Sequence, residues 1–322
     1  MSGDPLSDAL ALIDAHCVLA RAVLAGHPWS LTLRAYAPLM LVVPARGEFW
    51  LTVPGSGKQL LLAEGDIAVV HGDLEQVMSS RPDLEPEDGE ELFRRQGRAA
   101  LELGDSPDVT VLGCHIALDR NGEDLLLAAL PPVTHIRAQD GQAPVLHWLL
   151  DRLLAEMSAE GNGSAFAARQ YAGLLFVEVL RGFLADPSAG PPSWLRVLAT
   201  PALAPAAHAM QADPGRAWTL EHLARTVAMS RSTFAERFRE AAGVPPLTYL
   251  LHWRMRLAER ALREDDVTIA SLSHSLGYAT ESSFSHAFKR TLGLSPGQFR
   301  ERARAEMTDD AGPVTRAPSS TG

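Results

Sequence analysis

The 322-residue sequence predicts an α+β protein of two domains, a β-rich N-terminal domain and an all-α C-terminal domain. Short apolar runs separated by glycine and proline fill roughly the first 120 residues. Two Leu- and Ala-rich segments with helical periodicity follow them. The last third contains an internal repeat whose apolar residues recur at helical spacing, which is typical of duplicated helical units.

The β-rich domain is predicted from six short apolar or alternating runs with turn residues between them. Many short strands at such spacing are typical of a small antiparallel barrel or sandwich. The charged segment Arg81–Arg98 lacks this pattern and is expected to be a mobile loop. The six runs are Ser30–Tyr36, Leu39–Val43, Glu48–Val53, Gln59–Ala63, Ile67–His71 and Val109–Leu118.

The helical part and the domain limits follow from periodicity and from helix breakers. Apolar spacing predicts helices over Gln142–Ala159 and Ala165–Leu184, and the next domain is expected to begin with a helix over Pro201–Ala212. Between them, Asp186–Ser193 has the proline and glycine content that breaks helices. The predicted divisions are a first domain over 1–185, a linker over 186–197, a second domain over 198–304 and a disordered Ala-, Pro-, Ser- and Thr-rich tail over 305–322.

The net charge of −10 is unevenly distributed along the chain. Residues 216–304 carry 14 Lys and Arg against 9 Asp and Glu, a net charge of +5, whereas residues 1–215 carry a net charge of −13. A basic module joined to an acidic body is typical of a separate nucleic-acid-binding domain. No apolar run approaches the ~18 residues of a membrane span, and the N-terminus lacks the pattern of a secretory signal.

The segments Thr219–Tyr249 and Thr268–Phe299 are two copies of one pattern, and each predicts a helix, a short turn and a second helix. The hydroxyls of Ser230 and Thr280 can cap the second helices, as those of the two leading threonines can cap the first. The matched pairs are Thr219 with Thr268, Leu220 with Ile269, Leu223 with Leu272, Phe234 with Phe284, Phe238 with Phe288, Gly243 with Gly293, Pro246 with Pro296 and Tyr249 with Phe299.

The two phenylalanines of each second helix are four residues apart, so both face the core and the opposite face is exposed. That face is rich in side chains that can bind base edges in a major groove or phosphates beside it. Glu236 can accept from a cytosine amino group or form an ion pair within its helix, and His286 can donate to guanine or to phosphate. The candidate DNA-binding residues are Arg231, Ser232, Thr233, Glu236, Arg237, Arg239, Glu281, Ser282, Ser285, His286, Lys289 and Arg290.

The segment 216–302 resembles the DNA-binding domain of the AraC-type transcription regulators. The resemblance is carried by W-T-L-E-H-L-A-R-x3-M-S-R-S-T-F-A-E-R-F-R-E-x2-G from Trp218, and by G-Y-A-T-E-S-S-F-S-H-A-F-K-R-x2-G-L-S-P-G-Q-F-R over Gly277–Arg300. It implies seven helices, with Pro246–Arg263 as a long connector. It also implies that the second helix of each copy enters adjacent major-groove segments on one face of the DNA.

The first 185 residues resemble the cupin-type sensor domain found in one branch of these regulators. The resemblance is carried by D-P-L-S-D, A-R-G-E-F-W-L-T-V, L-A-E-G-D-I-A-V-V-H-G and A-L-P-P-V-T-H-I-R. It implies a cupin-like β-barrel that binds an effector, followed by a helical pair used for dimerisation. The candidate effector-pocket residues are Arg46, Glu48, Trp50 and His71.

Metal-binding cupins carry a His-x-His and a Glu on one strand, and a further His later in the chain. Here Arg46, Glu48 and Trp50 occupy the first motif, and Gln76 stands where the later His is expected. We therefore expect no bound metal, no cofactor and no enzymatic activity. The alternative is a metal-dependent cupin enzyme with an accessory DNA-binding domain.

The only two cysteines, Cys17 and Cys114, each adjoin a histidine. So few cysteines indicate no disulfide scaffold and favour a reducing cytoplasm. Because strand neighbours point to opposite faces, adjacency to histidine does not by itself lower a thiol pKa. We interpret both as buried small apolar residues, with a redox-sensing pair as the alternative.

The sequence therefore predicts a cytoplasmic, sequence-specific DNA-binding transcription regulator that responds to an effector or signal through its cupin-like domain. The expected partners are double-stranded DNA, a small-molecule effector, a second copy of the chain and, if it activates transcription, RNA polymerase. No membrane partner is expected. A helical adaptor that binds no DNA is a further alternative, and it would lack the steep salt dependence of phosphate contacts.

Overall fold

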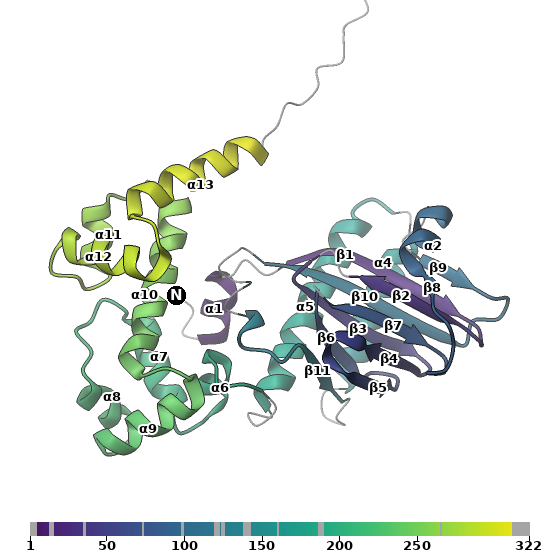
Figure 1. The fold of residues 1–322 in the computed structure, drawn as a ribbon, viewed down its shortest axis with the longest axis horizontal. Helices are drawn as coiled ribbons and strands as arrows, with labels where there is room; N and C mark the ends of the chain where they lie inside the picture. Colours follow the sequence, from purple (N-terminus) through teal and green to yellow (C-terminus); the bar gives the residue numbers. More distant parts are fainter. Residues whose placement is uncertain are drawn as a thin grey trace, which may run out of the picture. The chain divides into compact units, whose positions relative to one another are not determined.

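The computed structural model describes residues 5–12, 16–34, 37–72, 74–97, 100–118, 123, 126–137, 143–159, 161–185, 190–264 and 266–310. The chain divides into two compact units, one over Leu6–Pro201 and one that begins at Ala202 (Figure 1). The first contains all the described strands, and the described secondary structure of the second is all helical.

The N-terminal unit contains two β-sheets. One has six strands in the order β11-β6-β3-β10-β1-β9, and the other has five in the order β5-β4-β7-β2-β8. All neighbours are antiparallel except the pairs β1–β9 and β2–β8. The strands are β1 His16–Ala25, β2 Ser30–Arg34, β3 Leu39–Arg46, β4 Phe49–Val53, β5 Lys58–Leu62, β6 Ile67–His71, β7 Glu75–Ser79, β8 Glu87–Asp88, β9 Ala100–Leu103, β10 Val109–Ala117 and β11 Val133–Ile136.

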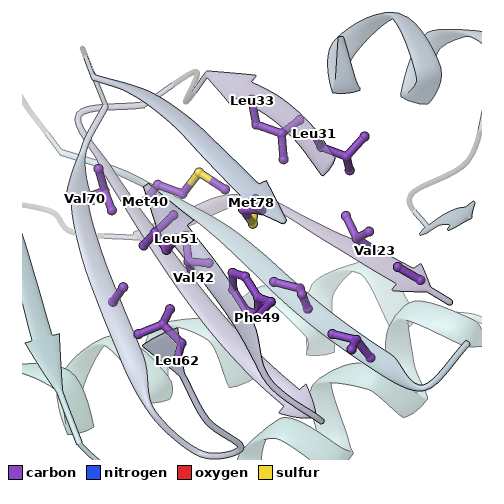
Figure 2. Packing of buried hydrophobic residues seen from close by; sticks show 14 of the residues in the cluster. Val23, Leu31, Leu33, Met40, Val42, Phe49, Leu51, Leu62, Val70 and Met78 are labelled. Atoms are coloured by element: carbon purple, nitrogen blue, oxygen red, sulfur yellow. The ribbon is translucent and has the colours of Figure 1, made fainter. Parts of the chain in front are cut away.

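The main apolar core of this unit lies between the two sheets (Figure 2). Met40 and Val42 of the six-stranded sheet belong to the same buried cluster as Phe49 and Leu51 of β4 and Met78 of β7. Alternation explains the contribution of β4, because its residues are buried and half-buried in turn and period-2 alternation sends every second side chain to the same face. Burying each such side chain stabilises the fold by roughly 1.5–3 kcal/mol.

The predicted β-rich domain is confirmed, but the expected barrel is not closed. Among the described strands, no ladder joins the two sheets, so the architecture is an open sandwich. The short helix α2, Gly89–Gln96, contacts β2 of one sheet and β9 of the other, and so spans one open side. At that side β8 has only two residues, which leaves too little backbone for a ladder to close.

The expectation of a mobile loop over Arg81–Arg98 is wrong, because this segment contains β8 and α2. Asp88 caps α2 by accepting from the backbone N–H groups of Glu90 and Glu91. Gly97 ends the helix with φ +64°, in the left-handed conformation that glycine adopts most readily. Both signals are present in the sequence, and they outweigh the high charge of the segment.

The remaining helices of this unit are α1 Pro5–Leu12, α4 Ala143–Ser158, α5 Ser164–Ala185 and α6 Trp194–Ala199, with a short 3-10 helix, η1, over Pro54–Ser56. The two predicted long helices are confirmed as α4 and α5, which pack against each other. They lie on the six-stranded sheet, α5 against β1 and β11 and α4 against β3. Helix α6, capped by Ser193, covers the last four residues of the expected linker and the first two residues of the expected second domain.

The C-terminal unit, which begins at Ala202, has seven helices in its described part, as expected. They are α7 Ala204–Ala212, α8 Leu220–Thr226, α9 Arg231–Ala242, α10 Pro246–Glu264, α11 Ile269–Ser275, α12 Glu281–Leu292 and α13 Pro296–Asp310. Helix α13 continues to Asp310, so the start predicted for the disordered tail, residue 305, is too early. Residues 311–322 of the predicted tail lie outside the described part of the chain.

The duplicated pattern corresponds to two helix-turn-helix units, α8–α9 and α11–α12. The four phenylalanines predicted to face the core are fully buried. In the first unit Phe238 packs edge-on to Phe234 and Tyr249, with ring centroids 5.5 and 5.4 Å apart. In the second, Phe288 lies 5.7 Å from Phe284 and 5.6 Å from Phe299. Each unit therefore has its own aromatic core, and α10 connects them.

Candidate nucleic-acid interface

Helix α9 is positioned by polar contacts at its first turn. The hydroxyl of Ser230 accepts from the backbone N–H of Thr233 at 3.2 Å and lies 2.9 Å from the Thr233 hydroxyl. Gly243 ends the helix with φ +75°. The preceding turn contains Ala228, which takes a positive φ of 52°. The equivalent position in the second helix-turn-helix unit is Gly277. These caps confirm both ends of the predicted helix.

Helix α12 is built in the same way. The hydroxyl of Thr280 accepts from the backbone N–H of Ser283 at 3.1 Å, and Gly293 ends the helix with φ +78°. The Ser283 hydroxyl donates to the Thr280 carbonyl at 2.8 Å. Thr233 and Ser283 hold equivalent positions, and in both units the hydroxyl at this position is engaged in the cap. Thr233 is therefore less available to DNA than its exposed neighbours.

The structure places the other predicted residues along one face of each helix. In α9, Arg231, Ser232, Glu236, Arg237 and Arg239 are exposed, and Thr233 is half-buried. In α12, Glu281, Ser282, His286, Lys289 and Arg290 are exposed, and Ser285 is half-buried. Both faces lie opposite the buried phenylalanines, as predicted, but their roles at DNA stay predictions.

Few ion pairs occupy these faces. Within the described part of the chain, no carboxylate pairs with Lys289 or Arg290, and no basic side chain pairs with Glu236. Exposed arginines elsewhere in the unit do have partners, such as Arg225 with Glu221 and Arg260 with Glu264. The ion pair within its helix that was considered for Glu236 does not form.

A hollow in the surface lies beside α12, next to the helix-turn-helix turn. Tyr278 forms one wall, and Ser283, His286, Ala287, Lys289 and Arg290 complete it. Burial raises the pKa of the Tyr278 hydroxyl, with smaller opposing effects from Arg254 and Arg290. The hydroxyl is therefore neutral and able to donate. Tyr278 was predicted only as a turn residue, and its position in the turn before α12 makes it an additional candidate for DNA contact.

In the N-terminal unit, none of the predicted effector-pocket residues lines the cavity that lies between the sheets. Arg46 and Glu48 are exposed at the β3–β4 turn, whereas Trp50 and His71 are half-buried. A small interior cavity of about 10 Å³, close to the space of one water molecule, lies elsewhere between the sheets. It is lined by Arg21, Val23, Leu33, Arg34, Met40, Met78, Glu90, Phe93, Val111, Gly113 and His115.

The polar wall of this cavity is a cluster around Arg21. Its guanidinium donates to Glu90 at 2.8 Å and lies 4.7 Å from the centre of the Phe93 ring. His115 is 2% exposed. Burial, followed by the charge of Arg21, lowers the pKa of His115 to about 4. The cluster joins β1, β10 and α2, segments far apart in sequence, so no local signal identified it.

Gln76, which stands where a metal-binding cupin has its later histidine, is fully buried on β7. Its amide nitrogen contacts the sulfur of Met40 at 3.4 Å, and its amide oxygen has no hydrogen-bond partner among the described residues. Across the same residues, no three His, Cys, Asp or Glu side chains lie close enough together to hold a metal ion.

The two cysteines lie on neighbouring strands but are not paired in register. Cys17 of β1 is opposite Ile116, and Cys114 of β10 is opposite Ala20. Cys114 is fully buried, as the interpretation of a small apolar residue requires. The side chain of Cys17 lies outside the described part of the chain, so its half of that interpretation stays a prediction.

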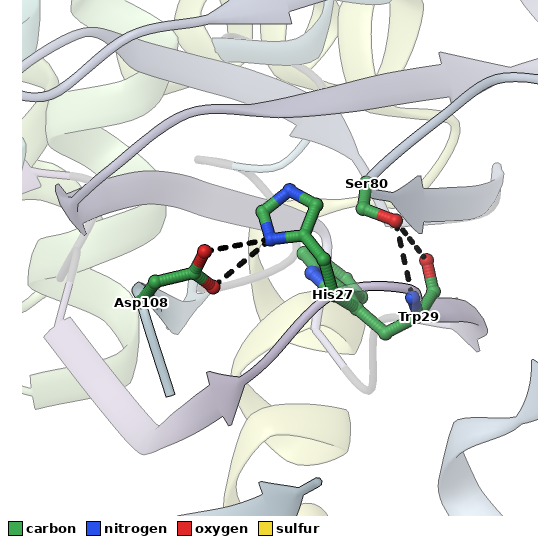
Figure 3. Close-up of polar contacts among 4 residues, drawn as sticks. All are labelled: His27, Trp29, Ser80 and Asp108. Carbon is green, nitrogen blue, oxygen red and sulfur yellow. Dashed lines mark hydrogen bonds and ion pairs between the residues drawn. The ribbon is translucent and has the colours of Figure 1, made fainter. Parts of the chain in front are cut away.

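A His–Asp pair joins two loops of the sandwich (Figure 3). The Nδ1 atom of His27 lies 2.8 Å from Asp108, linking the β1–β2 turn to the segment before β10. The nearby Ser80 hydroxyl bonds to the backbone N–H and carbonyl of Trp29. Since that hydroxyl is committed to the backbone, these residues join loops and do not form a hydrolytic triad.

No helix in the described part of the chain has the length and apolar character of a membrane span.

Comparison with known proteins gives both parts of the chain a family. Residues 4–185 match a model described as a cupin domain, and residues 223–302 match one described as a helix-turn-helix domain. An AraC-like transcription regulator of Streptomyces lividans is 36% identical over 298 residues, which cover 92% of this chain and 98% of the relative. A second, from Streptomyces antibioticus, is 34% identical over the same shares.

Among solved structures, the DNA-binding domain of AdpA in complex with a target DNA is 29% identical to this chain. It covers 32% of this chain and 93% of its own length, with a TM-score of 0.31. Two domain matches and a relative similar along nearly the full length define the family. The chain belongs to the AraC-type DNA-binding transcription regulators that carry an N-terminal cupin domain.

Proposed function

We propose that this regulator binds an asymmetric two-part DNA site, with α9 in one major groove and α12 in the next. The observation that carries the proposal is the pair of equivalent, exposed polar faces held by duplicate caps and duplicate aromatic cores within one unit. A single chain thus presents the two recognition helices that simpler helix-turn-helix proteins obtain by dimerising.

The chemistry of the two faces differs at equivalent positions. Arg231 of α9 corresponds to Glu281 of α12, Glu236 corresponds to His286, and Glu240 corresponds to Arg290. Two surfaces with exchanged charges do not favour the same bases. The two halves of the site are therefore different, and the site is not a palindrome within one monomer.

Within each face, we divide the residues by the part of DNA that they contact. Glu236 and His286, in the middle of each exposed stripe, read base edges. Arg231, Arg239, Lys289 and Arg290 bind phosphates, which position the protein without specifying sequence. The absence of competing ion pairs on Lys289 and Arg290 among the described residues supports this role.

Selection from random DNA with the full-length protein tests the proposal. The wild type should enrich one asymmetric site. Glu236→Ala should relax the base preference in one half only, and His286→Ala in the other half only. Arg260→Ala, at an exposed arginine of α10 paired with Glu264, is the control and should leave the preferences unchanged. Loss of preference in both halves with either variant, or no enrichment at all, would refute the proposal.

We further propose that the sandwich domain responds to a small polar effector at the cluster of Arg21, Glu90 and His115. This cluster supplies a cation, a carboxylate and a buried imidazole to a largely apolar cavity, and because the cavity is about the size of one water molecule, the two sheets must move apart to admit the effector. Compounds that raise the melting temperature of the wild type should fail to do so with Arg21→Met. Equal stabilisation of both proteins would place the effector elsewhere.

We also propose that the protein is a homodimer through α4 and α5. Several large apolar side chains of these helices are exposed, including Trp148 at 55% and Phe166 at 63%. Exposed apolar patches of this kind mark interaction surfaces. Sedimentation should show a dimer for the wild type and for Leu61→Glu, an exposed position on β5, and a monomer for Trp148→Glu. A monomeric wild type would contradict this assignment.

We also infer that the protein acts in the cytoplasm without enzymatic activity of its own, and that it contacts RNA polymerase where it activates transcription. The alternative of a metal-dependent cupin enzyme requires converging ligand side chains, and no such group occurs among the described residues.

A further inference from the structure

A half-buried arginine of α10 holds the leading loop of the first helix-turn-helix unit. The Nε atom of Arg254 donates to the carbonyl of Pro214 at 2.6 Å, and its Nη2 atom donates to the carbonyl of Arg216 at 2.9 Å. Both carbonyls lie in the loop between α7 and α8. One side chain of the connector thus fixes the backbone from which the first unit begins.

The same guanidinium also reaches the second helix-turn-helix unit, α11–α12. Its central carbon lies 5.7 Å from the ring centre of Tyr278, a residue of the turn between α11 and α12. Tyr278 in turn packs edge-on against Phe284 of α12, with ring centroids 5.4 Å apart. Because an arginine in a protein keeps its charge, its burial requires partners such as these. Burial lowers the pKa of Arg254, and Tyr278 opposes that shift.

The backbones of the two helix-turn-helix units also come close together near Arg254. A Cβ atom on Gly277 would lie 2.1 Å from the carbonyl oxygen of Gly215, and one on Gly215 would lie 2.5 Å from that of Ser275. Non-bonded atoms do not approach so closely, so glycine is required at both positions. The turn of the second unit therefore lies directly on the loop of the first.

We propose that Arg254 and the Gly215–Gly277 contact form an inter-unit lock that fixes the separation of α9 and α12, so that the protein selects the spacing between the two halves of its DNA site. The proposal rests on the proposed function, in which both helices enter DNA. Arg254 acts here as a positioning residue. Its guanidinium faces protein carbonyls and Tyr278, and its effect on DNA is exerted through the geometry of the two units.

The physical reason is the helical pitch of DNA. One added base pair moves a half-site along the axis and rotates it around the helix, because a full turn takes about 10 base pairs over roughly 34–36 Å. Two rigidly joined units cannot follow that rotation, whereas two loosely joined units can. A rigid joint raises the effective concentration of the second unit only at the matching spacing.

Affinity as a function of spacing provides the test. Full-length wild type and variants are titrated against the selected site and against versions with one base pair added or removed between its halves. Arg254→Met removes the donors, and Gly215→Ala separates the backbones by different chemistry. Arg260→Met on the same helix and Gly297→Ala, where a Cβ meets nothing within 4 Å, are the matched controls.

The wild type and both controls should lose about tenfold or more in affinity when the spacing changes by one base pair. Arg254→Met and Gly215→Ala should bind the selected site about tenfold more weakly, yet lose less than about threefold on changing the spacing. A spacing preference as sharp as that of the wild type in both lock variants would overturn the proposal, as would equal weakening at every spacing.

A measurement without DNA separates this proposal from the proposed function. Spin labels are attached to the full chain through His222→Cys and His274→Cys, at exposed positions of α8 and α11, and report the distance between the two helix-turn-helix units. Cys17→Ser removes one native thiol, and the other, Cys114, is fully buried. The distance distribution should be narrow in the wild type and broad in Arg254→Met and Gly215→Ala. Equally narrow distributions would refute the lock even if DNA binding is confirmed. A protein that enriches no DNA but shows the broadening would retain the lock and lose the function.

Discussion

The stability of the N-terminal unit should depend on pH through His115. This side chain is buried in the sandwich, and desolvation followed by the charge of Arg21 lowers its pKa from 6.5 to about 4, with Glu90 opposing. The folded state therefore favours the neutral imidazole. Because the pKa in the folded state is below that in the unfolded state, the stabilisation is complete above pH 6.5 and is lost as the pH falls toward 4.

The change in the free energy of unfolding follows from the size of the His115 pKa shift. A depression of this size is equivalent to about 3 kcal/mol over the whole range, of which about 2 kcal/mol is lost between pH 7 and pH 5. With a urea dependence of roughly 2 kcal/mol per molar for a unit of this size, the unfolding midpoint should fall by about 1 M over the same interval.

The thiol of Cys114 provides an assay specific to this unit. It is fully buried on β10, so it reacts with a pyridyl disulfide only when the sandwich opens. Urea titrations of the full chain with Cys17→Ser are compared at pH 7 and pH 5, with and without His115→Gln. Carboxylates contribute equally to both proteins, so the difference between them isolates the imidazole. An equal loss of stability in the two proteins would show that His115 does not cause the pH dependence.

Three further predictions concern the helical unit. Phe288→Ala removes a ring packed between Phe284 and Phe299 and should destabilise this unit by about 3–5 kcal/mol, measured by urea unfolding followed at the helical amides by hydrogen exchange. Thr280→Ala removes the cap of α12 and should cost about 1 kcal/mol in the same assay, whereas Thr280→Ser should restore most of it. Lys289→Ala combined with Arg290→Ala should make the slope of log affinity against log salt less steep by about 1.8, because two phosphate contacts are lost. Unchanged values in these assays would contradict the assigned packing, cap and phosphate roles respectively.

The helical unit was predictable because its signals are local. Capping hydroxyls, paired phenylalanines four residues apart and terminal glycines lie within one or two turns of the helix that they define. Thr219, Ser230, Thr268 and Thr280 all cap the helices for which they were predicted. The inter-unit lock was not predicted, because Arg254 reaches carbonyls about forty residues away along the chain.

The sandwich was predicted only in part, because sheet pairing is non-local. The run His16–Ala25 is apolar without clear alternation, and it became β1 only through pairing with β10 and β9. Three of the expected effector residues, Arg46, Glu48 and Trp50, come from a resemblance in a short motif around the β3–β4 turn, and the fourth, His71, comes from a second motif that ends β6. The cavity instead takes Arg21, Glu90 and His115 from three segments that only the folded sheets bring together.

Hydroxyl-radical footprinting of the full-length protein on its selected site shows whether α9 and α12 each bind one half of that site. We predict two protected patches per monomer on one face of the DNA, about one helical turn apart and with different base sequences. Glu236→Ala should weaken protection in one patch and His286→Ala in the other. A single patch, two halves of identical sequence, or protection unaffected by either substitution would show that α9 and α12 do not read separate halves of the site.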